Sequence, residues 1–217
     1  MKPKRGMFIT IDGPSGVGKS TTIRALHQEL TARGIPVHRT AEPTTSDLGR
    51  FIRAHFSHIR GHALACLVAA DRYEHAEHEI RPRLGAGDTV ISDRYVASTL
   101  VMQQLDGVPL KFLLDLNANV LMPDLAVVLT ADPGLIAERI AARGPLNRFH
   151  HDPTAPRREV VLYTEAAQTL MTAGVRVLVV NTGGVTPTEV AATIADALPG
   201  SSIASAASPQ STPSQGP

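Results

Sequence analysis

Residues 13–20 read Gly-Pro-Ser-Gly-Val-Gly-Lys-Ser, which satisfies the phosphate-loop pattern G-x-x-x-x-G-K-[ST]. The apolar segment 8–11, a predicted strand, precedes this loop, and a segment that favours a helix follows it. Glycines let consecutive backbone N–H groups converge on phosphate oxygens, and the helix presents its positive N-terminus to the same place. The motif therefore requires a strand–loop–helix unit and predicts that the chain binds a nucleoside triphosphate.

Two side chains of the motif have expected roles. Lys19 is predicted to reach the β- and γ-phosphates, and the Ser20 hydroxyl is predicted to hold Mg²⁺, so the expected donor is Mg·ATP. The alternative is an ordinary glycine-rich turn with an exposed lysine. The other donor contacts that we expect are Gly13, Ser15, Gly16, Val17, Gly18 and Thr21.

Short apolar runs alternate with longer helix-like stretches along the chain, which is the order typical of an α/β fold. Several runs are apolar almost without alternation, which indicates parallel strands covered on both faces. The expected strands are 7–11, 35–40, 89–92, 125–130 and 175–180. The expected helices are 19–33, 47–57, 63–81, 95–105, 110–119, 134–143, 157–172 and 187–198.

Charge and composition exclude several classes of protein. The net charge is +1, without the uniform basic field of a dedicated nucleic-acid or membrane-surface binder. No run approaches the roughly 18 apolar residues of a membrane span. We therefore expect a cytoplasmic protein that binds neither nucleic acid nor membrane. Its lone cysteine, Cys66, lies in the apolar run 64–70, and we expect a packed thiol.

Two segments depart from the regular alternation. Residues 144–156 hold three prolines and little periodicity, which predicts a lid loop at about 143–157. Residues 199–217 carry no charge and are rich in Pro, Ser and Ala, which predicts a disordered tail. One domain is therefore expected over residues 1–198.

Other motifs bear on which kind of phosphate chemistry the loop serves. A GTPase is expected to carry N/T-K-x-D after a late strand, but Asn181-Thr-Gly-Gly stands there. A motor or AAA-type ATPase tends to carry two adjacent carboxylates at a strand end, where this chain has Asp93 followed by Arg94. A cation beside a carboxylate suggests a second, acceptor phosphate.

Four segments, in order and spacing, resemble the thymidylate kinase family of nucleoside monophosphate kinases over nearly all of residues 7–198. They are FITIDGPSGVGKST, AEPTTSDLGRFIR, the stretch from LVAADRY to ISDRYVASTL, and DLNANVLMPDLAVVLTADPGLIAERIAARG. The resemblance implies a P-loop NTPase fold with a five-stranded parallel sheet flanked by helices, a lid loop and a homodimer. It also implies ATP-dependent phosphoryl transfer to a nucleoside monophosphate, with dTMP as the leading acceptor.

The resemblance also implies roles for single residues. Arg94 would clamp the acceptor phosphate, Asp93 would help hold the metal–water shell, and Arg72 would hydrogen-bond a pyrimidine carbonyl. The alternatives are a surface ion pair at 93–94 and a plain charged helix face around Arg72. Further acceptor contacts would come from Glu42, Pro43, Val68, Ser98 and Met102.

The phosphate loop itself contains no arginine, so its additional positive charge must come from elsewhere. The resemblance assigns this charge to the lid region, where Arg139 would contact the donor. Arg143 and Arg148 would act in catalysis with Lys19 and Arg94. The nine histidines suggest a zinc site as an alternative, but no cysteine or carboxylate set completes a four-ligand shell.

The chain departs from the family at four positions. Ala41 replaces the arginine of R-E-P, Val68 the stacking aromatic, Met102 a tyrosine under the sugar, and Ser15 a loop carboxylate. The loop is equally similar to that of cytidylate kinases. These departures leave two alternatives open: a kinase for a different or modified pyrimidine nucleotide, and a nucleotide-sensing protein without transfer activity.

Overall fold

A five-stranded parallel sheet forms the centre of the computed structural model, which describes residues 5–143 and 152–199. The strand order is β2-β3-β1-β4-β5, and every neighbouring pair is parallel. This confirms the predicted α/β fold. The strands are β1 (Phe8–Asp12), β2 (Val37–Ala41), β3 (Thr89–Asp93), β4 (Leu125–Thr130) and β5 (Val177–Asn181).

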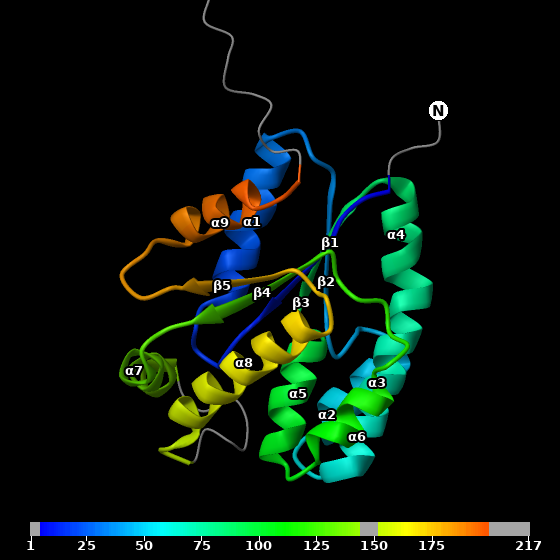
Figure 1. Cartoon of the computed structure of the whole chain (residues 1–217), viewed down its shortest axis with the longest axis vertical. Coiled ribbons are helices and arrows are strands. Elements are labelled where there is room, and N and C mark those ends of the chain that lie inside the picture. Colours follow the sequence, from blue (N-terminus) through cyan, green and yellow to red (C-terminus); the bar gives the residue numbers. More distant parts are fainter. Residues whose placement is uncertain (1–4, 144–151, 200–217) are drawn as a thin grey trace, which may run out of the picture.

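Helices cover both faces of this sheet (Figure 1). Neighbouring residues of one strand belong to opposite layers: Phe8 packs in one core cluster and Ile9 in the other. Because both faces are covered, several strands, such as β4, read as nearly continuous apolar runs, as predicted, whereas β2 (Val-His-Arg-Thr-Ala) does not. The helices are α1 (Lys19–Ala32), α2 (Asp47–His55), α3 (Gly61–His75), α4 (Arg81–Ala86), α5 (Val96–Leu105), α6 (Leu110–Leu116), α7 (Pro133–Arg143), α8 (Ala155–Thr172) and α9 (Pro187–Asp196), with a π-helical turn at Ala76–Ile80.

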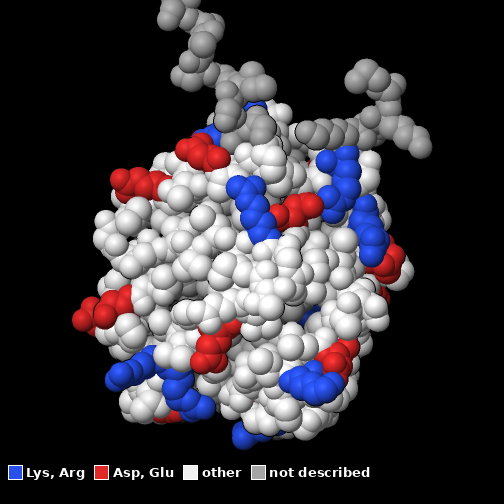
Figure 2. All heavy atoms as spheres, viewed as in Figure 1, with Lys and Arg blue, Asp and Glu red and all other residues white. Residues whose placement is uncertain are grey.

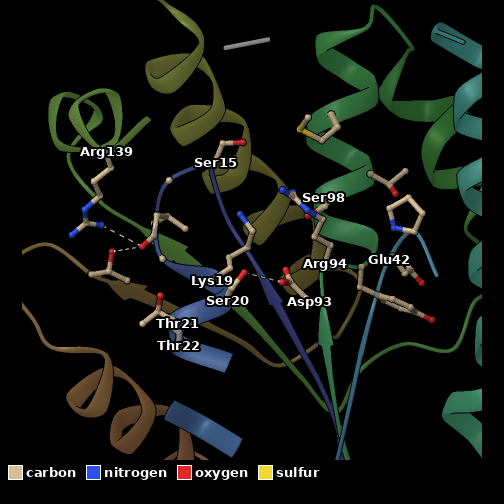
Figure 3. A pocket seen from close by; sticks show the side chains of 18 of the residues that line it. Ser15, Lys19, Ser20, Thr21, Thr22, Glu42, Asp93, Arg94, Ser98 and Arg139 are labelled. Carbon is tan, nitrogen blue, oxygen red and sulfur yellow. Dashed lines mark hydrogen bonds between the residues drawn. The ribbon is translucent and has the colours of Figure 1, made fainter. Parts of the chain in front are cut away.

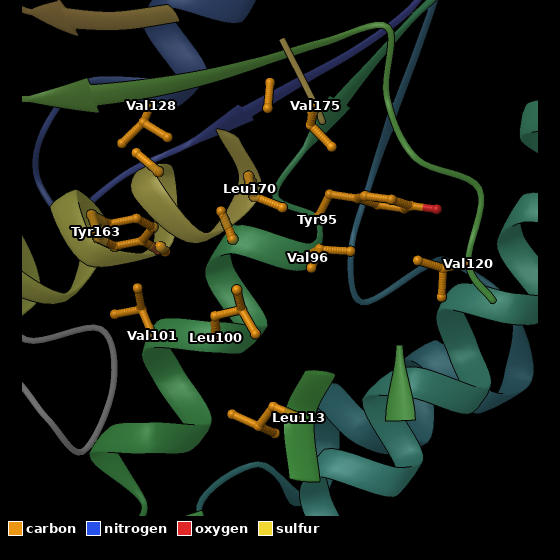
Figure 4. Packing of buried hydrophobic residues seen from close by; sticks show 14 of the residues in the cluster. Tyr95, Val96, Leu100, Val101, Leu113, Val120, Val128, Tyr163, Leu170 and Val175 are labelled. Atoms are coloured by element: carbon orange, nitrogen blue, oxygen red, sulfur yellow. The ribbon is translucent and has the colours of Figure 1, made fainter. Parts of the chain in front are cut away.

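Different helices cover the two faces of the sheet. Helices α1 and α9 pack together over one face of the sheet. The opposite face is covered mainly by α5 and α8, where Leu100, Val101, Tyr163 and Leu170 pack toward Val128 of β4 (Figure 4). Helices α2, α3 and α6 lie beyond α5 (Figure 1). This arrangement places α5 between the sheet and the outer helices.

The structure corrects three details of the predicted elements. Two strands begin two residues later than predicted, because Val37 and Val177 are the first residues that pair with β3 and β4. The predicted helix 63–81 continues as α4 to Ala86 after the π-helical turn. That turn lies just before Pro82, which has no N–H to donate to the preceding turn.

Cys66 is exposed, so the prediction of a packed thiol was wrong. Leu64, Ala65 and Ala69 are the residues of this run that α3 buries. Each step along a helix rotates the side chain by about 100°, so Cys66 lies on the outer side although its neighbours in the sequence are apolar.

The remaining expectations concern surface charge, membrane spans, the tail and the lid. On the face shown in Figure 2, basic and acidic side chains are interspersed. No helix in residues 5–143 or 152–199 is long and apolar enough to cross a membrane. Residues 200–217 of the predicted disordered tail and residues 144–151 of the predicted lid lie outside the described residues.

Candidate active site

One cavity of about 640 Å³ lies at the carboxyl ends of β1 and β3. This is where parallel α/β sheets bind their ligands. The phosphate loop lines one end, called here the donor end, and residues of α3 and α5 line the other, called the acceptor end (Figure 3). The predicted residues that line the cavity are Ser15, Gly16, Val17, Gly18, Lys19, Ser20, Thr21, Glu42, Pro43, Val68, Arg72, Asp93, Arg94, Ser98, Met102, Arg139 and Arg143.

Two predicted residues are not among the lining residues. Gly13 is the first residue of the loop, and a Cβ on it would come within 2.5 Å of the Leu129 carbonyl oxygen, so only glycine fits there. Arg148 lies outside the described residues. The segments that the sequence predicted to form the site are thus brought together, and the role of each residue stays a prediction.

The donor end begins at the N-terminus of α1. Gly18 takes a left-handed conformation with φ of 106° and begins the helix, and no side chain caps it. An uncapped helix start with a glycine-rich approach presents backbone N–H groups to an anion. The backbone therefore has the form that the motif predicted.

Lys19 lies folded against this loop. Its Nζ donates to the carbonyl oxygens of Gly13 at 2.7 Å and Pro14 at 2.9 Å, and the residue is only 7% exposed. Burial and then the charge of Arg94 lower the pKa of Lys19 to about 7, against the opposing effect of nearby carboxylates. A polyanion at the loop would favour the protonated amine.

Carboxylates gather beside the loop. Ser20 Oγ donates to Asp93 Oδ2 at 3.4 Å (Figure 3), and Asp12 Oδ1 accepts from the backbone N–H groups of Tyr95 and Ser98, both at 3.0 Å. Asp93 Oδ1 and Asp12 Oδ2 are buried without a hydrogen-bond partner among the described residues. Sequence reasoning missed Asp12, although a carboxylate that ends a buried strand just before a phosphate loop was a usable signal.

These oxygen atoms fit Mg²⁺, which prefers hard oxygen ligands and keeps several waters. Within the described part of the chain, no three His, Cys, Asp or Glu side chains form a group that could hold a metal ion. A bound Mg²⁺ would be held by Ser20 and Asp93, and phosphate and water would supply its other ligands. Ser20 and Asp93 therefore fit a Mg²⁺ ion that enters the site together with the nucleotide.

A second carboxylate reaches the loop from α8. Glu159 is 2% exposed, and its Oε2 accepts the Ser15 backbone N–H at 2.8 Å. Ser15 stands where the sequence resemblance implies a loop carboxylate, and in this structure a carboxylate reaches that position from another element. From α7, Arg139 Nη1 lies 3.5 Å from the Val17 carbonyl oxygen (Figure 3). Sequence reasoning missed Glu159, which lies 144 residues from Ser15.

Arg94 stands between the two ends of the cavity. It has a positive φ of 74°, which no other described non-glycine residue has. Its N–H donates to the Ile11 carbonyl oxygen at 3.0 Å, and this bond helps to hold the turn. A left-handed L-residue costs on the order of 1–2 kcal/mol. Strain of this kind concentrates at functional sites and here directs the guanidinium into the cavity.

The acidic surroundings of Arg94 keep it charged. Burial lowers its pKa, but the nearby Tyr163, Asp93, Asp12 and Glu159 outweigh that effect, so the pKa of Arg94 is raised overall. A charged planar guanidinium at the middle of the cavity is suited to donate two parallel hydrogen bonds to the oxygens of one phosphate.

Arg72 forms part of the wall at the acceptor end. Its Nε and Nη2 donate to Glu42 Oε2 at 2.9 and 2.7 Å, Nη2 also donates to Thr99 Oγ1, and Nη1 donates to Asn117 Oδ1, both at 2.6 Å. These bonds use four of the five N–H donors of the guanidinium. The remaining Nη1 hydrogen is the one available to a base. Glu42, expected to touch substrate, lines the cavity and also holds Arg72 in place through these bonds.

Sequence reasoning also missed several residues of the acceptor end. Gln103 is 2% exposed and lines the cavity, and its Oε1 is buried without a partner among the described residues. Ser98, Thr99, Met102 and Gln103 follow helical spacing on α5, so the period of the helix after Arg94 could have found Gln103. Phe56, at the end of α2, also lines the cavity.

Comparison with known proteins agrees with this geometry. The model of the family described as thymidylate kinase matches residues 11–183. A probable thymidylate kinase of Caldivirga maquilingensis is 37% identical over 166 residues, which cover 75% of this chain and 81% of the relative. The thymidylate kinase of Clavibacter sepedonicus is 41% identical over 153 residues, which cover 66% and 72%. With the loop, the strand-end arginine and the sheet order in place, the chain belongs to the thymidylate kinase family.

Proposed function

We propose that this protein is a nucleoside monophosphate kinase that transfers the γ-phosphoryl group of ATP to dTMP, which gives dTDP and ADP. The observation that carries this proposal is a single cavity with the phosphate loop at one end, Arg94 in the middle and Arg72, Met102 and Gln103 at the other. Relatives named thymidylate kinase, at 37% and 41% identity, support the choice of acceptor. No observation favours the sensing protein.

The donor end binds the triphosphate. The loop backbone and the start of α1 contact the phosphate oxygens, and Lys19 leaves its loop carbonyls to bridge the β- and γ-phosphates. Ser20 and Asp93 would hold Mg²⁺, which supplies positive charge to the donor oxygens. Arg139 and Arg143 line the cavity from α7 and add positive charge near the donor, and we infer the same role for Arg148.

Arg94 binds the acceptor monophosphate. That group has a second pKa near 6, so it is largely dianionic at pH 7 and can attack without a general base. The attacking phosphate oxygen forms a bond to the γ-phosphorus, and the bond from that phosphorus to the β–γ bridging oxygen breaks. Catalysis then consists of aligning two polyanions and neutralising charge, which the lysine and arginines of this cavity do.

The acceptor end selects the base. The unpaired Gln103 Oε1 can accept the N3–H of thymine, and the free Arg72 hydrogen can be donated to a ring carbonyl. Cytosine has no hydrogen at N3, so it would leave the buried oxygen of Gln103 unpaired. Leaving a buried polar group unpaired costs about 1–3 kcal/mol. This difference favours thymine over cytosine.

The experiment that tests the proposal is ADP release from Mg·ATP with dTMP, dUMP, dCMP, CMP, UMP, AMP, GMP and hydroxymethylated pyrimidine nucleotides. We expect the highest kcat/KM with dTMP. UMP should react more readily than in a relative with tyrosine at position 102, because the flexible Met102 can move away from a 2′-hydroxyl. No release with any pyrimidine nucleotide, from protein that binds ATP, would overturn the proposal.

Three further properties are part of the proposal. We infer one kinase domain over residues 1–198 with a lid at about 143–157, and a separate tail at 199–217. The resemblance supports a homodimer, which sedimentation equilibrium would test. The cytoplasmic location predicted from the sequence stays a prediction.

A further inference from the structure

We propose that Phe56, at the end of α2, supplies the aromatic surface on which the base of the acceptor nucleotide packs. This inference rests on the proposed function, since it concerns the acceptor end of the same cavity. It assigns to α2 a contact that Val68 on α3 cannot make, because a valine side chain has no aromatic face.

The aromatic residues of the structure leave few candidates for this contact. Of the described aromatic side chains, only Phe56 and Tyr95 line the cavity. Tyr95 is 1% exposed, its ring stands edge-on to Phe8 with 5.0 Å between centroids, and the Arg72 guanidinium lies 5.0 Å from the same ring. The Tyr95 ring is therefore packed by the protein itself. Phe56 lines the cavity and is partly exposed.

The spacing along α2 explains why Phe56 faces the cavity. Gly49 and Ile52 are the buried residues of this helix. Phe56 follows Ile52 by four residues, so it lies on the same face one turn further on. That inner face runs from the packed interior at Gly49 to the wall of the cavity at Phe56.

Two contacts fix α2 against α3, the helix that carries Val68 and Arg72. A Cβ on Gly49 would come within 2.1 Å of the Thr44 carbonyl oxygen, so the helix packs directly on the backbone of Thr44. Thr44 in turn donates its N–H to Asp71 Oδ2 at 2.8 Å and its hydroxyl to Asp71 Oδ1 at 2.6 Å. Asp71 directly precedes Arg72, so the position of Phe56 is coupled to that of the base-facing guanidinium.

The resulting acceptor end has the composition that a pyrimidine requires. Phe56, Val68 and Met102 give apolar surface for the faces of the ring, and Arg72 and Gln103 give polar atoms for its edge. Stacking of a base on an aromatic side chain contributes about five- to 150-fold in affinity. Phe56 is the described residue that can make this contribution.

Steady-state kinetics with dTMP and ATP test this assignment. Phe56→Leu keeps an apolar side chain and removes the ring, and we expect the acceptor KM to rise about tenfold while the donor KM and the melting temperature stay unchanged. Phe51→Leu is the matched control, because Phe51 lies on the same helix, is 44% exposed, stacks on His55 and does not line the cavity. Adding Val68→Phe to Phe56→Leu should restore the acceptor KM.

A binding measurement separates this inference from the proposed function. The chain contains no tryptophan, so Phe56→Trp introduces its one indole. We expect dTMP to quench or shift the emission of this variant, with ATP alone and the control Phe51→Trp showing no change. If the wild-type protein does not phosphorylate dTMP but this response is seen, the proposed function falls and the inference stands.

Two results would overturn the inference and leave the kinase assignment in place. One is an unchanged acceptor KM in Phe56→Leu together with wild-type turnover. The other is an emission of Phe56→Trp that does not respond to dTMP at concentrations that saturate turnover.

Discussion

The two ends of the cavity are built in different ways. The donor end consists largely of backbone from one stretch of eight residues, 13–20, where glycine conformation and close packing leave little choice. The acceptor end consists of side chains from the end of β2 and from α2, α3 and α5. Side chains on different helices can exchange tasks while a cavity keeps its shape, whereas a loop backbone cannot. The difference explains how the departures from the family pattern that the sequence indicates at Ala41, Val68 and Met102 can be accommodated around the acceptor end.

The donor end should give the largest effect. We expect Lys19→Ala to lower turnover by about a hundred- to a thousandfold, because no other side chain of the loop can bridge the β- and γ-phosphates. Its melting temperature should stay near that of the wild type, since among the described residues the amine donates to carbonyls of its own loop alone. Turnover close to the wild-type rate would remove Lys19 from the donor end.

Arg94 separates the two ends. We expect Arg94→Ala to lower kcat/KM for the acceptor about a hundredfold and to leave ATP affinity, measured without acceptor, within about threefold. Arg94→Lys keeps the charge without the planar fork and should fall between the two. If ATP affinity decreases as far as the acceptor KM rises, Arg94 belongs to the donor end and the division drawn here is wrong.

Glu159 tests whether the donor end depends on a distant carboxylate. We expect Glu159→Ala to weaken ATP binding about tenfold, because it leaves the Ser15 N–H in a buried position without its acceptor. Glu159→Gln offers an oxygen in the same place and should bind ATP almost as well as the wild type. Isothermal titration would measure both. A glutamine variant as weak as the alanine variant would show that charge, rather than the hydrogen bond, is what the loop needs.

The smallest expected effect is on the free energy of unfolding and concerns Glu79. Burial raises the pKa of Glu79, but hydrogen bonds from His38 and Thr40 and the charges of His75 and His38 lower it overall, below the ordinary 4.5. Because the folded pKa is lowered, this contribution to stability is present above pH 4.5 and is lost as the pH falls below it. We expect urea unfolding to give the wild type a higher free energy of unfolding than Glu79→Gln at pH 6. The difference between the two free energies should become smaller toward pH 3.5. A difference in free energy of unfolding that grows in acid would contradict a lowered pKa for Glu79.

The sequence could predict features that depend on neighbouring residues, but not contacts between residues far apart in the chain. The loop and the five strands were predictable, because motif spacing and burial on both faces leave a mark within a few residues. The neighbours of Arg72 were not, since Glu42, Thr99 and Asn117 lie 30, 27 and 45 residues away. The bond from Glu159 to the loop is of the same kind. Cys66 shows a different limit, because an apolar run does not reveal which side of a helix faces inward.

The left-handed backbone at Arg94 sets a limit on how this protein can be made more heat-resistant. A search for stabilising substitutions guided by backbone geometry would choose glycine at this position, since glycine adopts a positive φ without strain. Such a variant should remain folded at higher temperature and would lack the guanidinium that we propose binds the acceptor phosphate. Thermal stability and catalytic rate therefore conflict at residue 94, and selection of variants by melting temperature alone would favour inactive protein.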